Sequence, residues 1–104
     1  MSSKKKLIRT KFRDLVFARD NYTCKFCSSN DSLDAHHITD RSLMPNGGYV
    51  LSNGITLCKY HHGMAEQFHS TNGKEWQPNM HPDDLYKIID SSKELAEEES
   101  YRLT

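Results

Sequence analysis

The sequence has few cysteines, no long hydrophobic run and a modest hydrophobic content. Its three cysteines cannot all pair within one chain, which argues against a disulfide-stabilised secreted domain. No apolar run approaches the roughly 18 residues of a membrane span, and residues 1–12 lack the pattern of a secretory signal. With 36% hydrophobic residues in 104, little apolar material is available for a core. We therefore expect one domain, residues 1–104, in the cytoplasm, with its thiolates bound to a metal.

The formal net charge is zero at pH 7, because 14 Lys and Arg residues balance 14 Asp and Glu residues. The two ends of the chain nevertheless differ. Residues 1–30 carry eight cations and two carboxylates, whereas residues 83–104 carry three cations and seven carboxylates. The first segment would attract polyanions and the last would repel them. The alternative is that both charged surfaces are simply solvated.

The hydrophobic pattern predicts an α+β fold. Apolar residues recur at helical spacing in Ile8, Phe12, Leu15 and Val16, which predicts a basic helix that ends near Asn21. Two short β-prone segments are separated by a loop rich in proline and glycine, and a helix follows them. We expect Trp76 to be a core or packing residue. The predicted elements are helix 7–20, strands 33–38 and 55–57, helix 59–68 and an acidic helix 82–101.

Four residues have the spacing of a zinc-binding knuckle pair. Cys24 and Cys27 are separated by two residues, and so are Cys58 and His61. Each pair brings two ligands close to one point, as tetrahedral Zn²⁺ requires, and a site filled by four protein ligands is structural. His61 and His62 are adjacent, and neighbouring residues on a helix point about 100° apart, so His62 would face elsewhere. The alternative is free buried cysteines with an uninvolved His61.

A second set of residues is interleaved with the first, namely His36, His37, Asn53 and His62. Within DAHHITD and NGITLCKYHH, together with the RDNYTCKFC approach to the first knuckle, this combination resembles the HNH endonuclease family. The similarity covers about residues 19–68. It implies a small ββα-metal, treble-clef-like core flanked by helices, and the compact size resembles stand-alone members, many of them carried by phages. The setting implied is the cytoplasm of a bacterial or phage-infected cell.

The resemblance implies specific roles for these residues. His37 would be the general base, and His36 and His62 would bind a catalytic divalent ion. Asn53 would orient the loop that aims the base, or in a second interpretation approach the ion. Glu66, one turn beyond His62, is a possible third ligand, with a solvated helix glutamate as the alternative, and His69 is a weaker candidate. The ion would be Mg²⁺ or Mn²⁺, with Ni²⁺, Co²⁺ and Zn²⁺ also open.

The expected partner is DNA. Cations that could grip its phosphate backbone are Lys4, Lys5, Lys6, Arg9 and Arg41. No membrane partner is expected, while a homodimer or a phage DNA-processing protein is a possible partner. The predicted function is hydrolysis of phosphodiester bonds by nicking or double-strand cutting. The alternative is a non-catalytic, zinc-stabilised module that binds nucleic acid.

Overall fold

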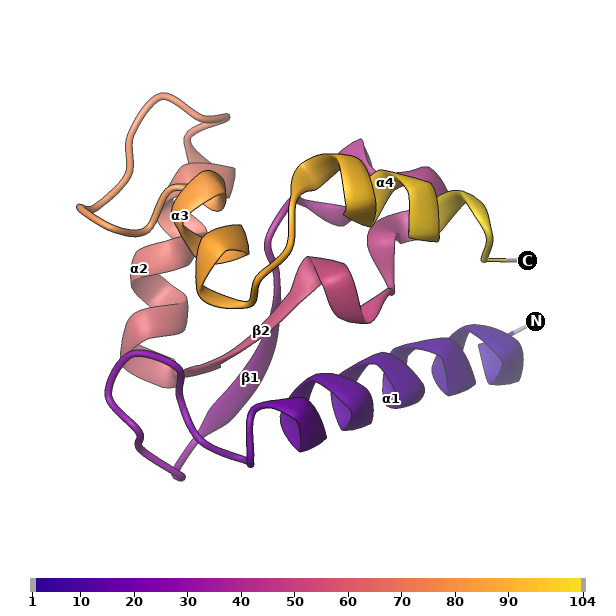
Figure 1. Ribbon diagram of the computed structural model, residues 1–104, viewed down its shortest axis with the longest axis horizontal. Helices are drawn as coiled ribbons and strands as arrows, with labels where there is room; N and C mark the ends of the chain where they lie inside the picture. Colours follow the sequence, from indigo (N-terminus) through magenta and orange to yellow (C-terminus); the bar gives the residue numbers. More distant parts are fainter. Residues whose placement is uncertain (1, 104) are drawn as a thin grey trace.

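The computed structural model describes residues 2–103, which contain four α-helices and one two-stranded antiparallel sheet (Figure 1). Both α1 and α2 contact both strands, so the hairpin lies between these two helices. The predicted α+β class is confirmed. In chain order the elements are α1 (Ser2–Arg19), β1 (Leu33–His37), β2 (Gly54–Cys58), α2 (Lys59–Ser70), α3 (Pro82–Ile88) and α4 (Lys93–Tyr101).

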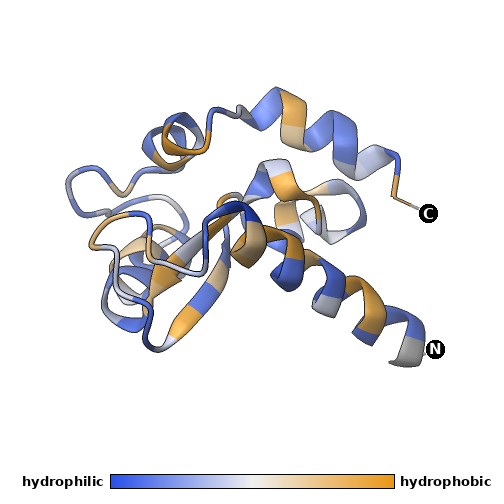
Figure 2. Cartoon of the chain, turned by 60° about the horizontal axis from the view of Figure 1, so that its bottom comes forward, coloured by the Kyte–Doolittle hydropathy of each residue, from blue (hydrophilic) through white to orange (hydrophobic). Residues whose placement is uncertain are grey.

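Helix α1 begins at Ser2, earlier than the predicted start at residue 7, and ends at Arg19. Phe12 and Val16 are buried, as their helical spacing predicts, whereas Leu15 remains 44% exposed. Asn21 has a φ of 57°, so it takes the left-handed conformation that stops a helix. Figure 2 shows hydrophobic and hydrophilic positions alternating along α1, as expected for a helix with a single packed face.

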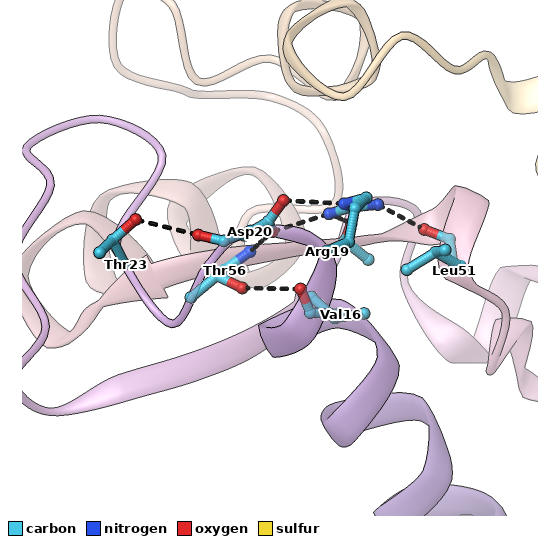
Figure 3. Close-up of polar contacts among 7 residues, drawn as sticks. Val16, Arg19, Asp20, Thr23, Leu51 and Thr56 are labelled. Carbon is cyan, nitrogen blue, oxygen red and sulfur yellow. Dashed lines mark hydrogen bonds and ion pairs between the residues drawn. The ribbon is translucent and has the colours of Figure 1, made fainter.

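An ion pair ties the end of α1 to the hairpin (Figure 3). The Arg19 guanidinium donates to both carboxylate oxygens of Asp20 at 2.8 Å, and to the carbonyl oxygens of Leu51 at 2.9 Å and Gly54 at 2.7 Å. Asp20 accepts a further hydrogen bond from the Thr56 backbone N–H at 2.9 Å. Burial raises the pKa of the Asp20 carboxyl, but Arg19 and Thr56 outweigh burial and hold it below its usual range. The ionised carboxylate therefore anchors α1 on β2.

The connection between the strands is long but well packed. It contains three short 3₁₀ turns, and at Gly47 and Gly48 the backbone has positive φ values of 81° and 67°. A Cβ atom on Gly48 would lie 2.7 Å from the side-chain nitrogen of Asn53. Glycine is therefore required where this loop passes over Asn53. The turns are Arg41–Leu43, Pro45–Gly48 and Leu51–Asn53.

The predicted acidic helix over residues 82–101 is two helices, so that prediction needs correction. Asp90 adopts a φ of 60°, and the Ser91 N–H bonds to the Tyr86 carbonyl at 2.8 Å, which closes the end of α3. The Ser92 hydroxyl then accepts from the Leu95 N–H at 3.1 Å and starts α4. The left-handed backbone at Asp90 and the Ser92 cap thus divide into two helices the segment whose apolar stripe suggested one.

The hydrophobic core lies between the hairpin, α2 and the two C-terminal helices. Its fully buried members include Ile38, Ile55, Leu57 and Leu85. Trp76 is not in this core, because it is 46% exposed and its ring packs 5.9 Å from that of Phe68 on the surface. In the part of the chain from residue 2 to residue 103, no helix has both the length and the apolar character needed to cross a bilayer.

Candidate functional site

The four knuckle residues meet at one point. Their ligand atoms all lie within 4.8 Å of one another, as the sequence predicted. The sulfurs of Cys27 and Cys58 are 3.7 Å apart, and the Nδ1 atom of His61 lies 3.3 Å from Cys58 and 3.7 Å from Cys24. A tetrahedral zinc site places two sulfurs about 3.8 Å apart and sulfur and nitrogen about 3.5 Å apart. The arrangement therefore fits a structural metal ion such as zinc.

Local structure holds these ligands in place. Cys24 and Cys27 lie in the turn after α1, Cys58 ends β2, and His61 lies in the first turn of α2. Burial raises the pKa of the Cys24 thiol, but backbone N–H groups, including that of Phe26 at 3.4 Å, outweigh burial and lower it. The Phe26 ring also stacks on His61 at 5.3 Å. The lowered pKa favours metal binding, since the thiolate is the ligand form of cysteine, and the ring contact helps to hold His61 in place.

A second cluster joins the hairpin to α2. His36 comes from β1, while His62 and Glu66 come from α2, and the three ligand atoms lie within 4.8 Å of one another. Glu66 Oε2 is 3.2 Å from His36 Nδ1 and 3.6 Å from His62 Nε2. The spacing of His62 and Glu66 by four residues puts both on one helix face. The structure thus brings together the two predicted ligands and the possible third.

The donor set of this second cluster suits a divalent ion. His36 is only 1% exposed, yet its Nδ1 atom makes no hydrogen bond of normal geometry within residues 2–103. Burial lowers the pKa of His36, so its ring is a neutral ligand at pH 7. Hydrogen bonding to His36, and then to His62, lowers the pKa of Glu66 and keeps it ionised. Two imidazoles and one carboxylate, with a buried imidazole nitrogen 3.2 Å from the carboxylate, form a set that could hold such an ion.

The sequence analysis missed a partner of His62. Asp34 Oδ2 lies 3.2 Å from His62 Nδ1, opposite the Nε2 atom that faces Glu66. The carboxylate of Glu66 and then that of Asp34 raise the pKa of His62, against the effect of burial. A carboxylate on one ring nitrogen fixes the tautomer and presents the other nitrogen as a ligand. The signal was present, since Asp34 and His36 are two apart and share a strand face.

His37 faces the opposite side of the hairpin from His36. Its ring stacks on Phe12 of α1 at 4.5 Å and meets the edge of Tyr49 at 4.8 Å. Its Nε2 atom is buried and has no hydrogen-bond partner among the described residues. Burial, followed by the charges of His36 and Arg41, lowers the pKa of His37 to about 4. The ring is therefore neutral at pH 7.

Asn53 is fully buried beneath the loop that follows β1. Its Oδ1 accepts from the Thr39 N–H at 3.0 Å and from the Tyr86 hydroxyl at 2.7 Å. Its Nδ2 donates to the carbonyls of Thr39 at 3.1 Å and Gly48 at 3.2 Å. Asn53 therefore fixes the backbone two residues after His37. The contribution of Tyr86, from distant α3, had no signal in the sequence.

Part of the predicted basic surface lines a groove of about 850 Å³ beside His37. Phe12 and Tyr49, which contact the His37 ring, form part of its wall. Arg41 donates to the Tyr49 hydroxyl at 3.1 Å. Of the predicted cations, Lys5, Arg9 and Arg41 line this groove, whereas Lys4 and Lys6 are exposed elsewhere on α1.

The geometry therefore comprises a closed Cys₃His cluster, a three-donor cluster and a neutral histidine beside a basic groove. The turn after α1 supplies Cys24 and Cys27, and the hairpin and α2 supply the other donors and His37, while α1 and the loop between the strands form most of the groove. Comparisons with protein-family models, with curated proteins and with solved structures found no match to this chain.

Proposed function

We propose that this chain is a metal-dependent DNA endonuclease of the HNH type, with β1, β2 and α2 as its ββα-metal core. One observation carries the proposal. His36 from the strand converges with His62 and Glu66 from the helix, while the Nε2 atom of the neighbouring His37 has no hydrogen-bond partner among the described residues. A separate Cys₃His cluster, which we assign to zinc, holds the same hairpin and helix together.

His36, His62 and Glu66 would hold the catalytic ion, for which we propose Mg²⁺ or Mn²⁺ because the set includes a carboxylate. When bound, a divalent ion stabilises negative charge on the phosphate and on the departing 3′ oxygen. Asp34 keeps the His62 ring in the orientation that presents Nε2 to the cluster. His36 contributes a neutral nitrogen because burial disfavours its protonated form.

His37 would act as the general base. Its neutral imidazole takes a proton from a water molecule whose oxygen forms the new bond to phosphorus. The bond between phosphorus and the 3′ oxygen breaks, and solvent returns a proton to the leaving oxygen. The products carry a 5′-phosphate and a 3′-hydroxyl. Asn53 supports this step by fixing the backbone of Thr39, so the strand end that carries His37 keeps its position.

The basic groove would hold the DNA backbone. Lys5, Arg9 and Arg41 supply positive charge along it, and Glu99 is the acidic residue in its lining. Since Phe12 and Tyr49 line the groove and contact His37, a strand bound there passes the proposed base. Phosphate contacts of this kind do not depend on base sequence, so binding to DNA of any sequence is expected at low salt.

The test is cleavage of supercoiled plasmid by zinc-loaded protein with Mg²⁺, Mn²⁺ or Ni²⁺. We expect His37→Ala to lower the cleavage rate about 10²- to 10⁴-fold, because a general base contributes that range. The variant should keep its zinc and its affinity for DNA, since it leaves both clusters intact.

A matched control is His81→Asn. His81 accepts a hydrogen bond from the Asp83 N–H and starts α3, and asparagine can replace that acceptor. This variant should cleave as the wild type does. Equal cleavage by His37→Ala and wild type would refute the assigned base. One bound zinc with DNA binding and no cleavage by any ion would instead support the non-catalytic module.

A further inference from the structure

His69, near the end of α2, contacts both histidines of the strand. Its Nε2 atom lies 2.9 Å from the backbone carbonyl oxygen of His37. Its ring stacks on the ring of His36 with centroids 5.2 Å apart and planes at 19°. One side chain thus touches the backbone of the proposed base and the ring of a proposed ligand.

The carbonyl of His37 needs a partner from outside the hairpin. The Ile38 N–H bonds to the Asn53 carbonyl at 2.9 Å, which continues the ladder in which His36 pairs with Ile55 and His37 with Gly54. In an antiparallel pair, backbone groups of alternate residues point away from the partner strand. His37 is one of these residues, so β2 cannot satisfy its carbonyl. His69 supplies the donor instead.

This hydrogen bond also fixes the state of His69. A carbonyl oxygen can only accept, so the Nε2 atom of His69 must carry the proton. The bond and the parallel stacking against His36 together set the position and the plane of the His69 ring. Offset stacking at this separation is a favourable arrangement of aromatic rings.

We propose that His69 is a positioning residue of the nuclease site, holding the His36 ring through its face and the His37 backbone through Nε2. The inference rests on the proposed function and adds a residue to it. Within residues 2–103, the potential ligand group contains His36, His62 and Glu66 and does not include His69. The Nε2 atom of His69 donates its hydrogen bond to the His37 carbonyl oxygen. His69 therefore acts through its two neighbours and does not bind the ion.

Two substitutions separate the two contacts. His69→Phe keeps a ring against His36 but removes the donor to His37. His69→Gln keeps an N–H donor near the position of Nε2 but removes the ring. Residues that orient ligands and catalytic groups in this way typically contribute about 10- to 100-fold to affinity or activity.

For His69→Phe we expect the cleavage rate at saturating Mn²⁺ to fall about 10- to 100-fold with KM for DNA unchanged, because the base shifts while the groove does not. Calorimetric titration of Mn²⁺ into the zinc-loaded variant should give the wild-type Kd. For His69→Gln we expect the reverse, a Kd for Mn²⁺ about 10-fold weaker with the rate largely retained at saturating ion. The ¹³C′ shift of His37 should move upfield in the Phe variant and stay in place in the Gln variant.

Ser70→Ala is the control, because this exposed neighbour donates only to the Gln67 carbonyl. Wild-type values in both His69 variants would overturn the proposal. Parallel losses of rate and Mn²⁺ affinity in both variants, in proportion to lost thermal stability, would also overturn it and show a purely structural role. A wild-type protein that binds Mn²⁺ without cleaving would refute the proposed function, while the Kd and ¹³C′ shifts would still decide the role of His69.

Discussion

The two ligand clusters share a hairpin and a helix but differ in the number and chemistry of their donors. The Cys₃His cluster offers four donors at the separations of a closed tetrahedron. The His36, His62 and Glu66 cluster offers three donors, none of them sulfur. A closed thiolate site leaves no position for water or substrate, whereas three donors leave positions open. The comparison separates a donor set that fits a structural ion from one that leaves positions on a bound ion open, as the proposed function requires.

Adjacent residues on α2 serve the two clusters. His61 points to the three cysteines and His62 points to His36 and Glu66, as the 100° step between helix neighbours predicts. The clusters are therefore close in sequence but differ in what they hold. Changes confined to one of them should reveal whether their roles are separate.

The largest expected effect comes from breaking the closed cluster with Cys58→Ser. Zinc binding to such sites contributes on the order of 10 kcal/mol, comparable to the whole stability of a domain. We expect this variant to lack cooperative unfolding by circular dichroism even with zinc present. The matched variant His62→Ala, which alters only the other cluster, should unfold cooperatively and retain one zinc by elemental analysis. A folded, zinc-free Cys58→Ser protein would contradict the division of roles.

The variant Glu66→Gln should weaken metal binding at the cluster formed by His36, His62 and Glu66. An amide lacks the negative charge of the carboxylate, so we expect Mn²⁺ to bind about 10- to 100-fold more weakly while zinc content is unchanged. Calorimetric titration of Mn²⁺ into the zinc-loaded protein measures the affinity, and elemental analysis measures the zinc content. The control is Glu98→Gln, which removes only an exposed pair with Arg102. Unchanged Mn²⁺ affinity in the Glu66 variant would show that this residue is a solvated glutamate and does not bind the ion.

Asp20 tests how much of the fold depends on contacts other than metal. Removing its charge should lower the free energy of unfolding at pH 7 by about 2 kcal/mol, since Arg19 and Thr56 lose an ionised acceptor. The folded pKa of Asp20 lies below its ordinary value of 3.8, so its contribution is present above about pH 4 and is lost as pH falls through the folded pKa.

Urea unfolding of wild type and Asp20→Asn from pH 7 to pH 3 measures this difference. Weaker zinc binding at low pH affects both proteins alike and cancels in the comparison. The difference in free energy of unfolding between the two proteins should be constant from pH 7 to pH 5 and should decrease below pH 4. A gap that widened on acidification would contradict the assigned ionisation.

The smallest effect is expected at Gly63, which follows His62 in α2. Among residues 2–103, and apart from its chain neighbours and the backbone of its own helix, a Cβ atom there would meet nothing within 4 Å. Gly63→Ala should therefore raise the free energy of unfolding by about 1 kcal/mol through helix propensity alone. Denaturant titration measures the change in stability. Zinc content by elemental analysis and Mn²⁺ affinity by calorimetry should both stay at wild-type values. Weaker Mn²⁺ binding would show that the helix must flex for the open cluster to form.

Much of the candidate site was predictable because its determinants are local. The spacing of Cys24 and Cys27 suits a knuckle, and the alternation of a strand sends His36 and His37 to opposite faces. The i, i+4 relation places Glu66 with His62. The second helix of the C-terminal region was not predicted, because its start depends on the hydroxyl of Ser92, which accepts from the Leu95 N–H in place of continued helical bonding.

The sequence by itself determined the donor chemistry, the short strands and the helix that presents two adjacent histidines to different sides. Only the tertiary structure decided that His69 bonds to the His37 carbonyl, that Tyr86 bonds to Asn53 and that Phe12 stacks on His37. Periodicity fixes which face of an element a residue occupies. It does not fix which distant element packs against that face, because that choice depends on burial and hydrogen bonding over the whole chain.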